Sequence, residues 1–171
     1  MLLAFALFTL PSFAQDQITR NDNKVIVGTI TGVAGGQVSY TQTSPSGGVI
    51  KVSLYLTDIK SVTMPVPPEV AKINANPNPD SAQAIATLEP VVRQFAGLPC
   101  DWVGESMAKL GDAYAAAGKA DQAAVMYAQI KQLYPKSGFV NLATASIARQ
   151  SLDAATIDEA IATRKPTVDK A

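Results

Sequence analysis

Two patterns of apolar and polar residues divide the chain. Between residues 16 and 64 apolar and polar positions alternate, and Val, Ile, Thr and Tyr are common, which is typical of half-buried β-strands. Past Asp80 the apolar residues recur every three or four positions among Ala, Leu, Gln and Lys, as they do in amphipathic helices. The sequence therefore predicts an α+β protein with a β module at 16–64 followed by a helical module at 81–164.

The β module is expected to contain four or five short antiparallel strands. Gly35 and Gly36 can supply the positive φ of a tight turn, and a second turn cluster lies at 44–48. So few strands cannot build a sandwich, which leaves a small antiparallel barrel that hides its edges, or an open meander packed on the helices. Strands are predicted at 25–33, 37–42, 49–56 and 59–64.

Prolines separate the two modules and interrupt the first long helix. The stretch 65–80 is predicted to be a Pro-rich linker, with room at 69–73 for one or two helical turns. Asp80 or Ser81 can cap the helix that follows. Pro90 is expected to kink or divide this helix, and Asp101 can cap the next one.

The stretch 104–137 contains a set of residues at characteristic spacings. These residues are Leu110, Gly111, Tyr114, Gly118, Ala123, Tyr127 and Pro135. They resemble the tetratricopeptide repeat, a helical hairpin of roughly 34 residues. In such a hairpin Gly111 and Ala123 let the two helices approach, while Tyr114 and Tyr127 fill the wedge between them. Met107 stands where the family usually has Trp, and Ile130 replaces a small residue.

The flanking segments resemble weaker copies of the same repeat. Residues 80–95 are similar to the second helix of an earlier repeat, and 140–164 to a further shortened hairpin. Repeat units cannot bury their apolar faces alone, so atypical flanking units are expected to act as caps. The resemblance thus covers about 80–164, and 165–171 is predicted to be a flexible tail.

The resemblance implies that an extended peptide or partner helix binds along the face of each repeat's first helix. The polar residues expected on that face are Glu105, Lys109, Asp112, Asn141 and Arg149. An alternative is that these charges are simply solvated, as most exposed helix charges are. Another is that the apolar face of the helices mediates self-association into a homo-oligomer.

The β module resembles small SH3-like and Sm-like barrels through Val27-Gly28-Thr29-Ile30, the Gly35–Gly36 turn and Leu56-Thr57-Asp58-Ile59. Membership of the Sm-like family would imply RNA binding. However, the chain has 14 Lys and Arg against 14 Asp and Glu, so it lacks the basic surface that draws phosphates. Nucleic acid is therefore not an expected partner.

Composition also limits the chemistry. The chain has no His and one Cys, which removes the commonest general base and the commonest metal ligand. Cys100 is expected to be a packing residue, and the acids Asp101 and Glu105, four apart, are explained by the helix N-terminus beside them. We therefore predict no catalytic residues, no metal site, no cofactor and no enzymatic activity.

The N-terminus has the pattern of a secretory signal peptide. An apolar run at 2–10 is broken by Pro11 and followed by Ser12-Phe13-Ala14, which predicts a signal peptide at 1–14 with cleavage near Ala14–Gln15. The run is too short to span a bilayer, although an uncleaved run would tether the chain to a membrane. The expected function is an exported, periplasmic or extracellular adaptor that binds a protein partner. The alternative is a self-associating structural subunit of an envelope complex.

Overall fold

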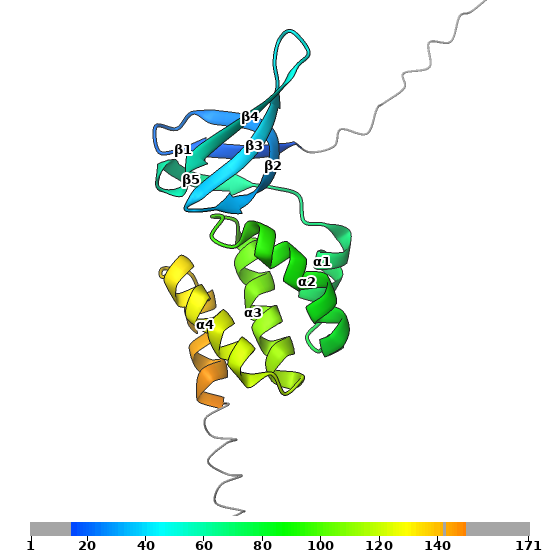
Figure 1. Ribbon diagram of the computed structural model, residues 1–171. Helices are drawn as coiled ribbons and strands as arrows, with labels where there is room; N and C mark the ends of the chain where they lie inside the picture. Colours follow the sequence, from blue (N-terminus) through cyan, green and yellow to red (C-terminus); the bar gives the residue numbers. More distant parts are fainter. Residues whose placement is uncertain (1–14, 142, 150–171) are drawn as a thin grey trace, which may run out of the picture.

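The protein folds as a five-stranded sheet followed by helices, in a computed structural model that describes residues 15–141 and 143–149. The elements in chain order are β1 (Asp16–Arg20), β2 (Val25–Ala34), β3 (Gln37–Thr43), β4 (Val49–Tyr55), η1 (Leu56–Asp58), β5 (Ile59–Thr63), α1 (Pro68–Ala75), α2 (Ser81–Phe95), α3 (Asp101–Ala116) and α4 (Ala120–Leu133). A further helical segment covers 139–149, apart from position 142. The sheet lies at one end of the molecule and the helices at the other (Figure 1). The α+β class is confirmed.

The sheet is open, so of the two predicted arrangements the closed barrel is wrong. Its strand order is β4-β3-β2-β1-β5 and its pairs are antiparallel. The four N-terminal strands form a meander, and β5 returns to pair with β1. The Val62 N–H on the outer side of β5 donates to the Pro99 carbonyl at 3.1 Å. A carbonyl of the loop before α3 therefore accepts the hydrogen bond that a neighbouring strand would accept in a closed barrel.

The alternation in the sequence places one face of the sheet in the core. Ile18, Val38 and Tyr40 are buried, whereas their neighbours along the strands are more exposed. Gly35 and Gly36 have φ of +56° and +75° and form the tight turn between β2 and β3, as predicted. The apolar positions of the strands are thus directed toward the helices.

The helical half agrees with the predictions in some details and differs in others. The linker at 65–80 contains α1, which buries Val70 and Ile73. Pro90 does not divide α2, which continues through it with the ring exposed to solvent. Asp80 caps α2 as predicted, by accepting a hydrogen bond from the Gln83 N–H at 2.8 Å.

The N-terminus of α3 is built differently from the prediction. Cys100, not Asp101, is the N-cap residue, and no side chain caps the helix. Asp101 lies in the first turn, where a negative charge still interacts favourably with the helix dipole.

Helices α3 and α4 form the helical hairpin that the sequence predicted between residues 104 and 135. A Cβ added at Gly111 would lie 2.5 Å from Cε1 of Tyr127, so the ring occupies the space that the missing side chain leaves. Tyr127 is 1% exposed and Ala123 is fully buried. Gly118, with φ of +73°, lies in the turn between the helices, and α4 ends at Leu133 before Pro135.

The sheet and the helices share one contiguous core. The indole N–H of Trp102 in α3 donates to the Met64 carbonyl just after β5 at 3.2 Å. The ring of Trp102 also contacts Phe95 of α2 edge to face, with centroids 6.2 Å apart, so Trp102 packs against the preceding helix. Gln94 of α2 donates its side-chain N–H to the Thr31 carbonyl of β2 at 2.9 Å. Trp102 and Gln94 therefore fix the end of the helical half that lies against the sheet.

Candidate protein-binding site

Asp112 of α3 is the centre of a polar cluster that joins three helical segments. Its Oδ1 accepts a hydrogen bond from the Tyr127 hydroxyl of α4 at 2.7 Å and another from the Ser146 hydroxyl of the 139–149 segment at 2.9 Å. No described residue donates a hydrogen bond to Oδ2, and Asp112 is exposed. The carboxylate is thus held by one oxygen and offers the other to solvent or to a ligand.

Tyr127 fixes the orientation of this carboxylate. Burial, and then the hydrogen bond to Asp112, raise the pKa of the Tyr127 phenol well above its ordinary value. The Ser146 hydroxyl and the positive charge of Arg149 act on this pKa in the opposite direction. The phenol therefore remains a proton donor to Asp112 at any physiological pH.

Lys109 lies one turn before Asp112 and has a structural partner. Its ammonium group donates to the Asn76 carbonyl at the C-terminus of α1 at 2.8 Å. A cation at this end of a helix interacts favourably with the helix dipole. Because an ammonium group has three donors, Lys109 can hold α1 and still bind a ligand.

Two adjoining hollows line this face of α3, and together we call them the α3 groove. One has a volume of about 420 Å³ and includes Tyr127, Ser146 and Arg149; the other, of about 280 Å³, includes Lys109. The residues common to both are Pro77, Asn78, Asp112 and Ala116. The groove therefore runs along α3 between the loop after α1 and the 139–149 segment.

The structure brings together three of the five predicted partner-binding residues. Lys109, Asp112 and Arg149 line the α3 groove. Glu105 is half-buried in α3 and Asn141 is exposed at the start of the last helical segment, and neither lines the two hollows.

The sequence prediction missed several lining residues. Ser146 was not selected, Tyr127 was expected only as a packing residue, and Pro77 and Asn78 were assigned to a linker. One signal for Ser146 was present: it follows Asp112 by 34 positions, the period of a tetratricopeptide repeat.

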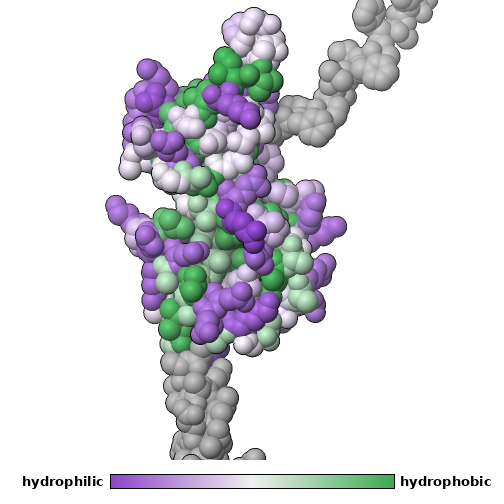
Figure 2. All heavy atoms as spheres, viewed as in Figure 1, coloured by the Kyte–Doolittle hydropathy of each residue, from purple (hydrophilic) through white to green (hydrophobic). Residues whose placement is uncertain are grey.

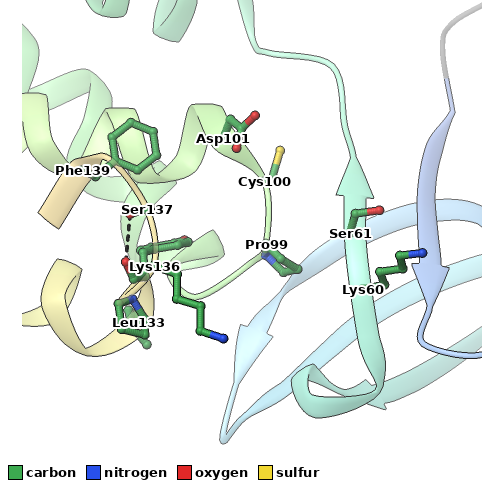
Figure 3. A pocket seen from close by; sticks show the side chains of 11 residues that line it. Lys60, Ser61, Pro99, Cys100, Asp101, Leu133, Lys136, Ser137 and Phe139 are labelled. Atoms are coloured by element: carbon green, nitrogen blue, oxygen red, sulfur yellow. Dashed lines mark hydrogen bonds between the residues drawn. The ribbon is translucent and has the colours of Figure 1, made fainter.

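A second pocket lies between the sheet and the helices, with a volume of about 600 Å³ (Figure 3). Lys60 and Ser61 of β5 form one wall, and the segment after α4 forms another. The Lys60 ammonium already donates to Asn23 at 2.8 Å. Cys100 is 8% exposed, and burial raises the pKa of its thiol, so the thiol stays protonated and weakly nucleophilic at neutral pH.

This second pocket is the weaker candidate. Its lining is mainly apolar, and its polar groups do not converge on one point as they do around Asp112. Within 15–141 and 143–149, no group of three or more His, Cys, Asp or Glu residues could hold a metal ion. The α3 groove is therefore the better-defined candidate site.

Comparisons of the chain with family models, curated proteins and solved structures gave no match. Among the described helices, none has the length and apolar character needed to cross a membrane.

Proposed function

We propose that the protein is a non-catalytic adaptor that binds an extended segment of a partner protein in the α3 groove. The observation that carries the proposal is the carboxylate of Asp112, which Tyr127 and Ser146 hold by Oδ1 while no residue of 15–141 or 143–149 donates a hydrogen bond to Oδ2. Binding sites use such fixed polar groups because a ligand then meets an acceptor that is already oriented.

The groove offers both kinds of polar partner that an extended peptide needs. Asp112 can accept from a backbone N–H or a cationic side chain, and Arg149 and Lys109 can donate to carbonyls or carboxylates. Ala115 and Ala116 have short side chains on the α3 side of the groove, so a peptide backbone can approach the helix. With two cations and one anion, the groove favours a segment that carries an acidic residue.

The arrangement of the helices supports a tetratricopeptide-like interpretation. The Gly111–Tyr127 contact and the turn at Gly118 follow the spacing of the repeat. The hydrogen bond between Asp112 and Ser146 joins residues 34 positions apart, which suits equivalent positions in successive repeats. In this interpretation α3 and the 139–149 segment are first helices, whose common face binds partners in such arrays.

We also propose that the protein is exported and acts in a bacterial-type cell envelope or outside the cell. The support is the apolar run at 2–10 with Ala14 at a cleavage position. The predicted signal peptide lies outside the described residues. Mass spectrometry of the protein recovered from the periplasm of an expressing cell should give a chain that starts at Gln15. An intact N-terminus in the cytoplasm would exclude export.

The binding proposal can be tested with a displayed library of random peptides. Peptides enriched on the wild-type protein should carry an acidic residue, and Arg149→Glu should weaken their binding by about tenfold or more. Lys131→Glu is the matched control, because Lys131 is an exposed lysine of α4 that lines neither hollow. Circular dichroism should show that both variants remain folded.

Asp112→Asn separates binding from packing. The amide oxygen of Asn can still accept from Tyr127 and Ser146, but the negative charge is lost. Peptides with a cationic residue should lose affinity for this variant while its stability changes little. If no peptide is enriched, or if enriched peptides bind Arg149→Glu as well as the wild type, the groove is not the binding site.

A further inference from the structure

The two edges of the sheet differ in how they are covered. The outer side of β5 faces the loop before α3, and its Val62 N–H donates to Pro99. No described strand pairs with the outer side of β4, which is the last strand at the other end of the sheet (Figure 1). An uncovered strand edge is a template for pairing with another strand, because its N–H and C=O groups have no protein partners.

The sequence of β4 has few of the usual protections of such an edge. Its register with β3 is regular from Val49 to Tyr55, whereas the β1–β5 and β2–β3 pairs contain bulges. The strand contains no Pro and a single charge, Lys51. Val49, Ile50 and Tyr55 are 71%, 50% and 59% exposed. Figure 2 shows apolar surface on the sheet just below the projecting loop, among polar neighbours. Strands that must remain unpaired usually carry charges, a bulge or a proline.

The hydrogen bonds fix which residues of β4 can pair outward. The Leu56 N–H donates back to Gly36 at the start of β3. Because backbone groups alternate in direction along a strand, even-numbered residues of β4 pair with β3. The odd-numbered residues therefore direct their N–H and C=O groups to the free edge: Val49, Lys51, Ser53 and Tyr55.

We propose that two copies of this chain pair through β4, antiparallel, around a two-fold axis at Val52. This register places Lys51 of each copy opposite Ser53 of the other, and Val49 opposite Tyr55. An aromatic residue against a β-branched one is a favourable cross-strand pair. The register uses the whole strand and keeps the two lysines apart.

Neighbouring registers are less favourable. A two-fold axis at Lys51 would place the two lysines directly opposite each other, and like charges in this position destabilise a sheet. An axis at Ser53 would set Val49 opposite Thr57, which lies in η1 and not in a strand. The strand is thus self-complementary in one register, which favours a second copy over an unrelated strand. The product is a dimer with one continuous sheet.

The first test is sedimentation equilibrium of the full chain with variants at position 53. Ser53→Lys places the introduced lysine of each copy opposite Lys51 of the other, and should raise the dimer dissociation constant by about tenfold or more. Ser53→Glu creates two opposite-charge pairs and should leave the dimer intact or tighten it at low salt. Thr63→Lys is the matched control, because Thr63 is exposed on β5 at the other edge.

A double variant that exchanges residues 51 and 53 tests whether Ser53→Lys weakens the dimer only because it disturbs folding. Lys51→Ser combined with Ser53→Lys keeps one lysine in each strand and again sets it opposite a serine, so the dimer should be restored. A wild-type chain that stays monomeric at high micromolar concentration would overturn the proposal. So would a dimer that Ser53→Lys does not weaken, because its interface must then lie elsewhere.

A disulfide test fixes the register directly. Val52 of one copy lies opposite Val52 of the other, at a position without hydrogen bonds, where Cα atoms are ~4.5 Å apart. This separation suits a disulfide, so oxidised Val52→Cys should migrate as a covalent dimer. Tyr55→Cys should not, because the two Tyr55 positions would be ~20 Å apart along the paired strands. Equal cross-linking of both variants, or none with Val52→Cys, would exclude this pairing.

Discussion

Gly111→Ala tests the contact on which the α3–α4 hairpin depends. The added Cβ would lie 2.5 Å from Cε1, 3.0 Å from Cδ1 and 3.1 Å from Cζ of Tyr127. Unstrained carbon contacts are about 3.5–4.0 Å, so the ring must move by about 1 Å. Tyr127 is 1% exposed, so the ring has little free space. Its movement also disturbs the 2.7 Å hydrogen bond to Asp112.

Two effects of this substitution oppose each other. Ala is favoured over Gly in a helix interior by up to ~1 kcal/mol. Overpacking a close-packed core costs ~1–3 kcal/mol, and a hydrogen bond to a charged group contributes ~1.5–3 kcal/mol. The structure therefore predicts a net loss of about 2 kcal/mol in the free energy of unfolding. For a chain of this length the midpoint temperature should fall by roughly 4–8 °C.

Urea unfolding followed by far-UV circular dichroism measures this loss. The control is the same substitution in a Tyr127→Val background, where the side chain ends before the ring atoms that the new Cβ would meet. In that background only the helix preference remains, so Gly111→Ala should stabilise the protein. A wild-type background in which Gly111→Ala is neutral or stabilising would refute the close-contact argument.

Three further changes test other contacts by the same unfolding measurement. Trp102→Phe loses the indole hydrogen bond between the helices and the sheet module and should cost ~1 kcal/mol; no loss would mean that the bond is not formed in solution. Asp112→Ala leaves Tyr127 and Ser146 without their acceptor and should cost ~2 kcal/mol, whereas an unchanged midpoint would contradict the clustered geometry. Burial raises the pKa of Tyr134 to about 12. Since this folded-state pKa exceeds the unfolded value near 10, the contribution to stability is complete below pH 10 and is lost as the pH rises toward 12. Tyr134→Phe should flatten this alkaline loss, and an equal loss in both proteins would contradict the assignment.

Local signals in the sequence were sufficient for much of the fold. Alternation located the strands because one face of the sheet is buried, and Gly35–Gly36 marked a turn because both residues adopt positive φ. Asp80 was identified as a cap since its carboxylate can reach the third residue of the helix. The α3–α4 hairpin was predictable because Gly111 leaves space for Tyr127 at a fixed separation along the chain.

Contacts between distant segments were not predictable in the same way. The open form of the sheet involves a contact between distant segments. The Pro99 carbonyl accepts the hydrogen bond of the Val62 N–H, 37 positions away, on the side of β5 where a closed barrel would have another strand. Helix α1 was uncertain because its amphipathic pattern is short and flanked by prolines. Pro90 fits within α2 since its ring faces solvent. These outcomes depend on tertiary contacts, and the spacing of apolar residues along the chain carries no information about them.

The candidate site shows the same limit. Lys109, Asp112 and Arg149 were selected by helical phase, and they line one groove. The role of Lys109 in holding the C-terminus of α1 depends on where α1 ends. The orientation of Asp112 depends on Ser146 in a separate helical segment. Helical phase can therefore predict a face, whereas the partners of each charge require the packing of neighbouring helices.

The two proposed surfaces lie in different parts of the molecule. The α3 groove is on the half of α3 that follows Lys109, while the sheet contacts the opposite end of α3 around Trp102. Pairing through β4 would leave both grooves of a dimer open. Two linked grooves raise the effective concentration of the second binding event, and avidity can exceed the single-site affinity by about 10²–10⁴.

The dimer should therefore matter for partners presented in many copies. A groove-binding peptide fixed densely on a surface should release the wild-type protein far more slowly than it releases Ser53→Lys. The same peptide free in solution should bind both proteins with equal affinity, because Ser53 is remote from the groove. Surface plasmon resonance at high and low peptide density measures the first difference, and titration calorimetry the second. Equal release at high density would show that one dimer does not engage two peptides, even if each surface binds as proposed.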